Sequence, residues 1–379
     1  MTVGAPRLID STLREGEQFA TASFSTDQKV AIARALDEFG VDYLEVTSPA
    51  VSRQAARDVE RIVRLGLRSR VIAHARCMLS DVQAAIDAGV SAIGMYFATS
   101  PVLRRASHGR DIEQVIDAMA PPIALALEAG LETRFSAEDA FRTSDEELLR
   151  VVVAAARLGV HRVGLADTIG TATPAEVHRL VSLVSQAVPC NVGFHGHNDA
   201  GCAIANAYEA VRAGASHVDV SVLGIGERVG ITPLGGFLAR LLTATDAPIA
   251  ERYRLDRLPE LEALVARCVG VDVPFNNCIT GSTAYTHKAG THIKAMIQDP
   301  ASYEPIPPET FGVHRTLVIG SPLTGRHAVA HRARQLGLRL SPEAVIAVTT
   351  EVKELARQRE LTDAALDQLL RKRSGGDGA

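Results

Sequence analysis

Two short polar segments, far apart in the sequence, carry the residue types that bind divalent metal ions. Residues 10–18 read DSTLREGEQ and residues 194–199 read FHGHND, and each follows an apolar run typical of a strand. His195 and His197 are two positions apart, so on a strand both side chains point to the same side. With Glu15 they would hold magnesium, manganese, cobalt or zinc and leave positions open for substrate oxygens. The alternative for either histidine alone is a polar strand end hydrogen-bonded to nearby loops.

Arg14 precedes Glu15 in the first segment. A fixed guanidinium beside a metal could stabilise an enolate or alkoxide as negative charge develops on oxygen. The alternative is a surface ion pair with Glu17.

Further polar side chains fall at the ends of other predicted strands. Arg134, Ser136 and Glu138 alternate along one of them, His74 lies near the end of another, and Thr168 follows a third. Such residues suit a small acid with two anionic ends, because they offer donors for each end while a metal chelates an α-keto acid between them. The alternative is a satisfied polar network that closes this end of the fold.

Two later segments add weaker signals. Backbone amides of residues 224–230, GIGERVG, could hold a phosphate. The alternative is a plain flexible connection, which can have the same glycine-rich sequence. His287 and His292 lie further along, and a histidine there could act as a base if a fold-back or a second subunit carried it to the site. The alternative is an exposed loop histidine.

The elements that must position these residues alternate regularly. Amphipathic helical patterns at residues such as 26–39 and 174–187 separate the strands, at roughly the 30-residue spacing of a βαβ unit. This pattern predicts an α/β fold, a closed (β/α)8 TIM barrel, in which the C-terminal strand ends share one face. The eight strand candidates are residues 7–11, 42–47, 70–75, 92–98, 132–137, 162–167, 191–195 and 217–222.

The alternation ends near residue 242, and three regions are expected. We predict a barrel catalytic domain over residues 1–270 and a linker region over 271–320 that carries His287 and His292. A small, mostly helical region over 321–379 would follow. Its last residues, 371–378, are expected to form a frayed tail.

The composition favours small-molecule partners. The 379 residues are 46% apolar and carry a net charge of −4, which gives no electrostatic footprint for nucleic acid. No apolar run of 18 residues and no basic leader segment occurs, so no membrane association is expected and the expected location is the cytoplasm. Five scattered cysteines without CxxC spacing are typical of reduced, buried side chains.

Six segments together resemble the homocitrate synthase branch of the family that also contains isopropylmalate synthases and related metal-dependent condensing enzymes and lyases. The resemblance covers most of the chain. The matching segments are residues 10–18, 134–139, 164–168, 195–208 with its GCAIANAY core, 224–236 (GIGERVGITPLGG) and 287–295 (HKAGTHIKA).

This resemblance implies a Claisen-type condensation. Acetyl-CoA would lose a methyl proton, its enolate would attack the keto carbon of a metal-chelated 2-oxo acid, and the thioester would be hydrolysed. Arg14 would polarise the keto oxygen, and His292 would accept the proton, supplied by the partner subunit of a homodimer. The remaining roles follow by position: metal ligands Glu15, His195 and His197; oxo-acid contacts His74, Arg134, Ser136 and Thr168; and Glu138 with the catalytic residues.

Three positions depart from the homocitrate synthase pattern. Gly94 stands where that pattern has an aspartate, Gly193 where it has a glutamate, and Ile297 where it has a tyrosine soon after the catalytic histidine. Loss of two carboxylates, with Arg76 near His74, would make the distal pocket more positive. We therefore consider a phosphonopyruvate-like substrate, giving a 2-phosphonomethylmalate-type product, beside 2-oxoglutarate and oxaloacetate.

Two other functions compete with acyl transfer. A metal-dependent carbon–carbon lyase could use the same barrel, but cleaving relatives carry a catalytic cysteine in the glycine loop, where this chain has Glu227 and Arg228. A non-catalytic binding protein could also retain the barrel.

Overall fold

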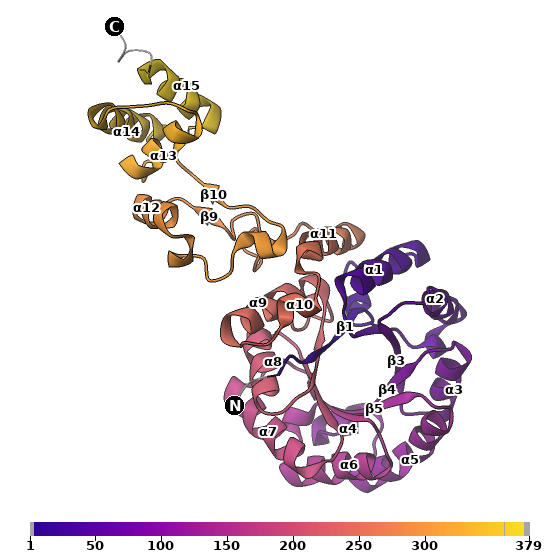
Figure 1. Ribbon diagram of the computed structural model, residues 1–379. Helices are drawn as coiled ribbons and strands as arrows, with labels where there is room; N and C mark the ends of the chain where they lie inside the picture. The colour runs from indigo at the N-terminus through magenta and orange to yellow at the C-terminus, as the bar shows by residue number, and fades with distance from the viewer. Residues whose placement is uncertain (1–3, 360, 375–379) are drawn as a thin grey trace. The chain divides into compact units, whose positions relative to one another are not determined.

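Eight parallel strands close into a barrel in the first of two units. The computed structural model describes residues 4–359 and 361–374, and the chain divides into Met1–Val273 and Pro274–Ala379. Consecutive strands pair in order and β8 closes on β1, with helices around the outside (Figure 1). The strands are β1 (Arg7–Leu13), β2 (Tyr43–Val46), β3 (Arg70–Arg76), β4 (Ala92–Ala98), β5 (Glu132–Glu138), β6 (Arg162–Asp167), β7 (Asn191–Gly196) and β8 (His217–Val220). The predicted TIM barrel is confirmed.

Helices in the first unit begin and end at recognisable caps. The Ser25 hydroxyl accepts a hydrogen bond from the Gln28 amide at the start of α1, and Gly40 ends that helix with a φ of 101°. The sequence predicted α1 and α7, but not α5, which contains Pro121 and Pro122. The helices are α1 (Thr26–Phe39), α2 (Arg53–Val63), α3 (Leu79–Asp87), α4 (Pro101–Ser107), α5 (Ile112–Glu128), α6 (Asp145–Arg157), α7 (Pro174–Ala187), α8 (Ala203–Arg212), α9 (Leu234–Ala244), α10 (Ile249–Arg252) and α11 (Leu258–Val269).

The barrel interior holds a small apolar cluster among polar side chains. Ile9, Tyr43, Ile72 and Ala92 form this buried cluster. Side chains on a strand alternate between its two faces, so every second residue of β5 shares the interior face, and these residues are polar along the whole strand. The polar side chains at the C-terminal ends of the strands form a site.

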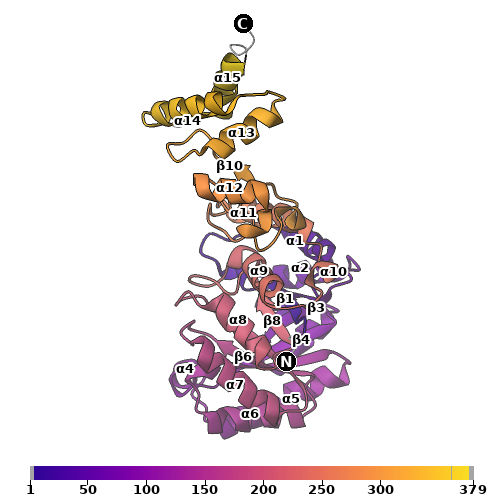
Figure 2. The ribbon, with the colours of Figure 1, turned by 60° about the vertical axis from the view of Figure 1, so that its left-hand side comes forward.

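The second unit is mostly helical and has its own hydrophobic core. Its helices are α12 (Gly290–Gln298), α13 (Arg326–Gln335), α14 (Pro342–Ala356) and α15 (Asp363–Ser374), and β9 (Thr286–His287) pairs with β10 (Thr316–Leu317). Helices α13, α14 and α15 pack together (Figure 1 and Figure 2). Ile293 of α12 belongs to the same core. The three-part division at residues 270 and 320 stays a prediction.

The expected frayed tail is partly helical. Residues 371–374 form the last turn of α15, and residues 375–378 lie outside the described residues. Across residues 4–359 and 361–374, no helix is long and apolar enough to cross a membrane.

Candidate active site

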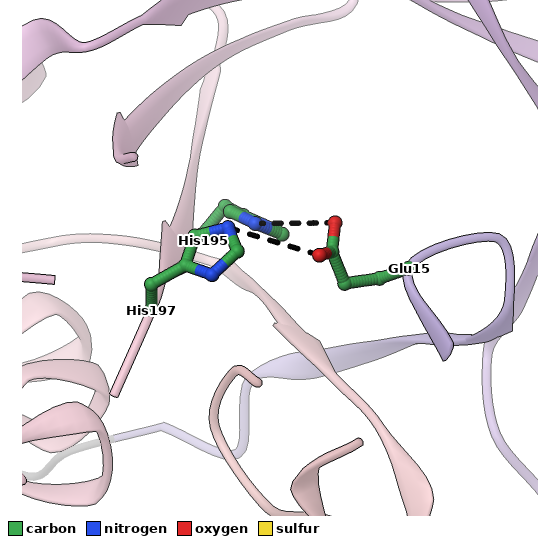
Figure 3. Close-up of side chains that lie close together, drawn as sticks. All are labelled: Glu15, His195 and His197. Atoms are coloured by element: carbon green, nitrogen blue, oxygen red, sulfur yellow. Dashed lines mark ion pairs between the residues drawn. The ribbon is translucent and has the colours of Figure 1, made fainter. Parts of the chain in front are cut away.

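Glu15, His195 and His197 meet at the C-terminal end of the barrel strands (Figure 3). Glu15 Oε2 lies 4.0 Å from His195 Nε2, and Glu15 Oε1 lies 3.8 Å from His197 Nε2. These separations are too long for hydrogen bonds, but two atoms that each lie about 2.1 Å from one ion are separated by up to about 4.2 Å. The ligand atoms of the three residues all lie within 4.8 Å of one another, only slightly beyond that limit, so a small adjustment of the side chains would let them share one divalent ion.

The protonation states of this cluster also suit a metal. Burial, the neighbouring His195 and other cations lower the pKa of His197 to about 3, so its imidazole is neutral at pH 7. Burial would raise the pKa of Glu15, but Arg14 and the two imidazoles outweigh it and lower that pKa to about 2. A neutral imidazole and an ionised carboxylate are the forms that bind a cation.

Glu15 is held by a tight turn and by the glycine loop. Its own amide donates to the Ser11 carbonyl across 2.7 Å at the end of β1. Its Oε1 accepts a hydrogen bond of 3.0 Å from the Glu227 amide. A Cβ at Gly226 would lie 2.8 Å from Glu15 Cγ, so the loop can approach this closely because residue 226 is glycine. The loop amide expected to bind phosphate therefore binds the carboxylate of a candidate metal ligand.

Arg14 is buried beside the cluster. Its Nε donates to Glu45 Oε2 across 2.7 Å and its Nη1 donates to Glu15. Glu17 instead pairs with Lys29 at 2.6 Å. The alternative of a surface ion pair between Arg14 and Glu17 is wrong, and the guanidinium is fixed at the barrel mouth.

Two buried carboxylates that the sequence reasoning missed support these groups. Glu45 on β2 also accepts from Ser11 Oγ at 2.6 Å, and Asp219 Oδ2 on β8 lies within hydrogen-bond distance of His195 Nδ1, at 3.1 Å. Arg134 joins the two, because its Nη1 donates to Asp219 and its Nη2 to Glu45. Despite burial, the neighbouring arginines hold the pKa of Glu45 well below its usual range.

These residues surround one cavity of about 260 Å³. A cavity of this size fits a small ligand. Residues for which the sequence suggested no role also line it, among them Gln18, Tyr96 and Asp219. Its lining includes nine of the ten residues with a predicted role: Arg14, Glu15, His74, Arg134, Ser136, Glu138, Thr168, His195 and His197.

The cavity wall offers neutral donors as well as charges. The His74 ring stacks on Tyr96 with centroids 4.6 Å apart, and burial and Arg14 lower the pKa of His74 to about 4. The Thr168 hydroxyl oxygen accepts from the Asp139 amide at 2.8 Å, which leaves its hydrogen free to donate. Burial and the neighbouring Asp139 raise the pKa of Glu138.

Other side chains occupy the space beside Gly94 and Gly193, two of the positions that depart from the homocitrate synthase pattern. A Cβ at Gly94 would lie 2.8 Å from Arg134 Nη2, so this guanidinium occupies the space an aspartate there would need. Gly193 lines the cavity, and its Cβ would lie 3.3 Å from Arg162 Cδ. Arg76 forms two 2.9 Å hydrogen bonds with Asp81, which neutralises its charge. Arg76 therefore adds no net positive charge to the distal pocket.

His287 and His292 lie in the second unit. His287 Nε2 lies 3.0 Å from Glu304 Oε1, whereas His292 is exposed in the first turn of α12. The His292 ring stacks on Tyr303 at a centroid distance of 4.2 Å. Ile297, which stands where the homocitrate synthase pattern has a tyrosine, packs against the core of the unit. His292 thus has a tyrosine beside it, although not at the position expected.

Comparisons with solved structures agree on the fold. HMG-CoA lyase from Bacillus subtilis aligns with a TM-score of 0.65 at 20% identity, covering 73% of this chain and 97% of the lyase. The lyase from Pseudomonas aeruginosa aligns with a TM-score of 0.63 at 22% identity, covering 74% and 98%. Identities this low show a shared barrel and nothing more about activity.

Comparisons of sequence define the family. The HMGL-like family model matches residues 5–265, and a homocitrate synthase post-HMGL domain-like model matches residues 279–360. The chain therefore belongs to the HMGL-like family and is an acyltransferase of the type that converts the acyl group to an alkyl group on transfer. Within that family it belongs to the homocitrate synthase branch, as the resemblance predicted.

Three curated relatives illustrate this branch. Mitochondrial homocitrate synthase of Schizosaccharomyces pombe is 47% identical over 96% of this chain and 87% of its own length. The cytosolic isozyme of Saccharomyces cerevisiae is 45% identical over 96% and 85%. Homocitrate synthase of Sulfurisphaera tokodaii is 35% identical over 97% and 80%. Enzymes of this branch depend on a metal and use acetyl-CoA.

Proposed function

We propose that this protein condenses acetyl-CoA with a 2-oxo acid that carries a second anionic group, and that 2-oxoglutarate is this acid. The observation that carries the proposal is the cluster of Glu15, His195 and His197 beside the buried Arg14, inside one cavity. The relatives named homocitrate synthase, at 45–47% identity, support the choice of 2-oxoglutarate.

Glu15, His195 and His197 would hold the divalent ion. A divalent ion bound there would supply Lewis-acid polarisation of the oxo acid. The donor set of one carboxylate and two imidazoles suits magnesium, manganese, cobalt or zinc. The metal itself is to be identified by analysis of the purified protein.

The side chains of the cavity bind the acid and balance its charge. Arg14, held in place by Glu45, stabilises the negative charge that develops on the keto oxygen as the new carbon–carbon bond forms. The Thr168 and Ser136 hydroxyls line the cavity and would donate to carboxylate oxygens of the acid. His74 is neutral, so it adds a hydrogen bond without adding charge.

Two groups are proposed to move protons. Glu138 lines the cavity, and its raised pKa favours a role as a proton donor or acceptor there. We assign removal of the acetyl methyl proton to His292 of a second copy of the chain, in a homodimer. Attack on the keto carbon gives a tertiary alcohol, and water then cleaves the thioester to release the CoA thiol.

The phosphonate substrate is the alternative acid. The relatives are named for homocitrate and isopropylmalate, and Arg76 is neutralised by Asp81, so little supports it. Gly94 and Gly193 still distinguish this cavity from the homocitrate synthase pattern. Oxaloacetate is the other alternative acid.

The test is thiol release from acetyl-CoA, measured as kcat/KM with 2-oxoglutarate, oxaloacetate and 3-phosphonopyruvate. We expect the highest value with 2-oxoglutarate, and a higher value with 3-phosphonopyruvate would overturn the choice of acid. No thiol release with any acid, together with cleavage of a tertiary 3-hydroxyacyl-CoA, would indicate the lyase instead. His195→Ala should abolish turnover. His178→Ala should not change it, because His178 is a half-buried histidine on α7 that pairs with Glu209 away from the cavity.

The cytoplasmic location stays a prediction. The yeast relatives' names include both cytosolic and mitochondrial enzymes. Fractionation of the source cells would decide it.

A further inference from the structure

Asp219 connects a candidate metal ligand to a buried arginine. Its Oδ2 lies 3.1 Å from His195 Nδ1, and its Oδ1 and Oδ2 lie 3.1 Å and 3.2 Å from Arg134 Nη1. The Asp219 side chain is 5% exposed and that of Arg134 is 4% exposed. A buried carboxylate in this place accepts from both neighbours at once.

The chain of contacts continues from Arg134 to Arg14, the arginine proposed to stabilise charge on the keto oxygen. Arg134 Nη2 donates to Glu45, whose side chain is fully buried, and Glu45 in turn accepts from Arg14 Nε. Both terminal nitrogens of Arg134 are therefore committed to carboxylates. One continuous series of ion pairs runs from His195 to Arg14 across strands β7, β8, β5, β2 and the end of β1.

We propose that Asp219 is a positioning residue for His195, and that Arg134 serves mainly as the clamp that holds Asp219 and Glu45. This role rests on the metal site of the proposed function. When Asp219 accepts the Nδ1 hydrogen of His195, the lone pair of Nε2 points toward Glu15, 4.0 Å away. Free rotation of the imidazole is prevented at the same time.

Asparagine at residue 219 would weaken the contacts with both neighbours. If its oxygen took the place of Oδ2, it could still accept from His195 and from Arg134 Nη1, but its NH2 group would face Nη1, also a donor, at about the 3.1 Å now seen for Oδ1. The opposite amide orientation would set a donor against both neighbours. Asp219→Asn therefore removes the charge and displaces the group that contacts His195, while keeping the size of the side chain.

The decisive experiment compares Mn²⁺ dissociation constants of the metal-free wild type and three variants by calorimetry. Glu45→Gln removes the same charge from the same cluster but leaves the contact between Asp219 and His195 intact. Asp58→Asn removes a buried carboxylate paired with Lys29 elsewhere in the barrel. We expect Asp219→Asn to weaken binding about 10–100-fold, as loss of such supporting residues does. Glu45→Gln should change it only about threefold, as screened charge effects between non-contacting groups do, and Asp58→Asn not at all.

The outcomes separate this inference from the proposed function. Equal weakening by Asp219→Asn and Glu45→Gln would mean that charge alone matters, and would overturn the role of Asp219. A wild type that binds no Mn²⁺ would overturn the metal site itself. Should Asp219→Asn lose its thermal unfolding transition, ¹⁵N spectra of the metal-free wild type decide instead. Assigned with His195→Asn, they should show hydrogen on Nδ1 of His195, and hydrogen on Nε2 would overturn the proposal.

Discussion

Replacing Gly226 by alanine should weaken metal binding without unfolding the barrel. The added Cβ would lie 2.8 Å from Glu15 Cγ and 3.1 Å from Glu15 Oε1. Carbon atoms in contact prefer about 3.5 Å, so one side must move by roughly 0.7 Å. Metal–ligand distances tolerate only about 0.2 Å, so a shift of this size in Glu15 disrupts coordination.

The glycine loop is less free to move than the Glu15 side chain. The Ile231 amide donates to the Gly224 carbonyl at 3.0 Å, and Arg228 is paired with Asp199 at 2.7 Å. Moving the loop would break these contacts, whereas Glu15 can change its side-chain torsions. We therefore expect the carboxylate to move and to lose its 3.0 Å hydrogen bond from the Glu227 amide.

The expected weakening of Mn²⁺ binding is about 10–100-fold, or about 1.4–2.7 kcal/mol. Calorimetric titration of the metal-free protein measures it, and thermal unfolding checks the fold. Gly4→Ala is the matched control, because nothing described lies within 4 Å of its Cβ. If Gly226→Ala kept both the wild-type melting temperature and a dissociation constant within about threefold of wild type, Glu15 would not be a ligand.

Three further predictions concern the assembly, stability and metal dependence. Arg14→Ala and His292→Ala should each be inactive. If His292 acts across subunits, refolding the two variants together should restore about a quarter of wild-type activity, because half of the dimers are mixed and each mixed dimer has one intact site of two. No recovery would mean that His292 acts within its own chain. Burial raises the pKa of Asp10 to about 7, above its unfolded value, so its contribution to stability is lost as pH rises from about 4 to 7. In urea unfolding measured across this pH range, Asp10→Asn should show a smaller decline in stability than the wild type. Parallel stability–pH curves for the two proteins would refute this. Removal of metal by chelation should abolish calorimetric binding of 2-oxoglutarate, and Mn²⁺ should restore it; binding that persists in the metal-free protein would contradict the charge balance described below.

The barrel could be predicted because its signal is repetitive. Eight apolar runs separated by amphipathic segments constrain one another, and all eight strands lie within about two residues of their predicted bounds. Helix α5 was not predicted because Pro121 and Pro122 lie inside it, and prolines normally indicate the end of a helix. The second unit gave weaker signals, since its helices are separated by irregular segments.

The site was predictable where residues share a segment or a spacing. His195 and His197 are two apart at the end of β7, and Glu15 follows β1, so the cluster of three candidate ligands could be predicted from strand ends alone. Glu45 and Asp219 were not predicted as site residues, because each is a single acid in a strand of four residues and belongs to no motif of polar residues nearby in sequence. A usable signal was present, since a charged residue in a short buried strand must be paired.

The charges around the cavity indicate why a bound cation would help this protein to bind a dianion. Arg14, Arg134 and Arg228 contribute three positive charges, while Glu15, Asp219, Glu227 and the buried Glu45 contribute four negative ones, so these groups carry a net charge of −1. Glu138, which also lines the cavity, adds a further negative charge when it is ionised. A cavity of this charge repels an acid with two carboxylates, and a divalent ion would reduce that repulsion. Because Arg14 and Arg134 already pair with carboxylates, the ion rather than a free guanidinium would supply the attraction.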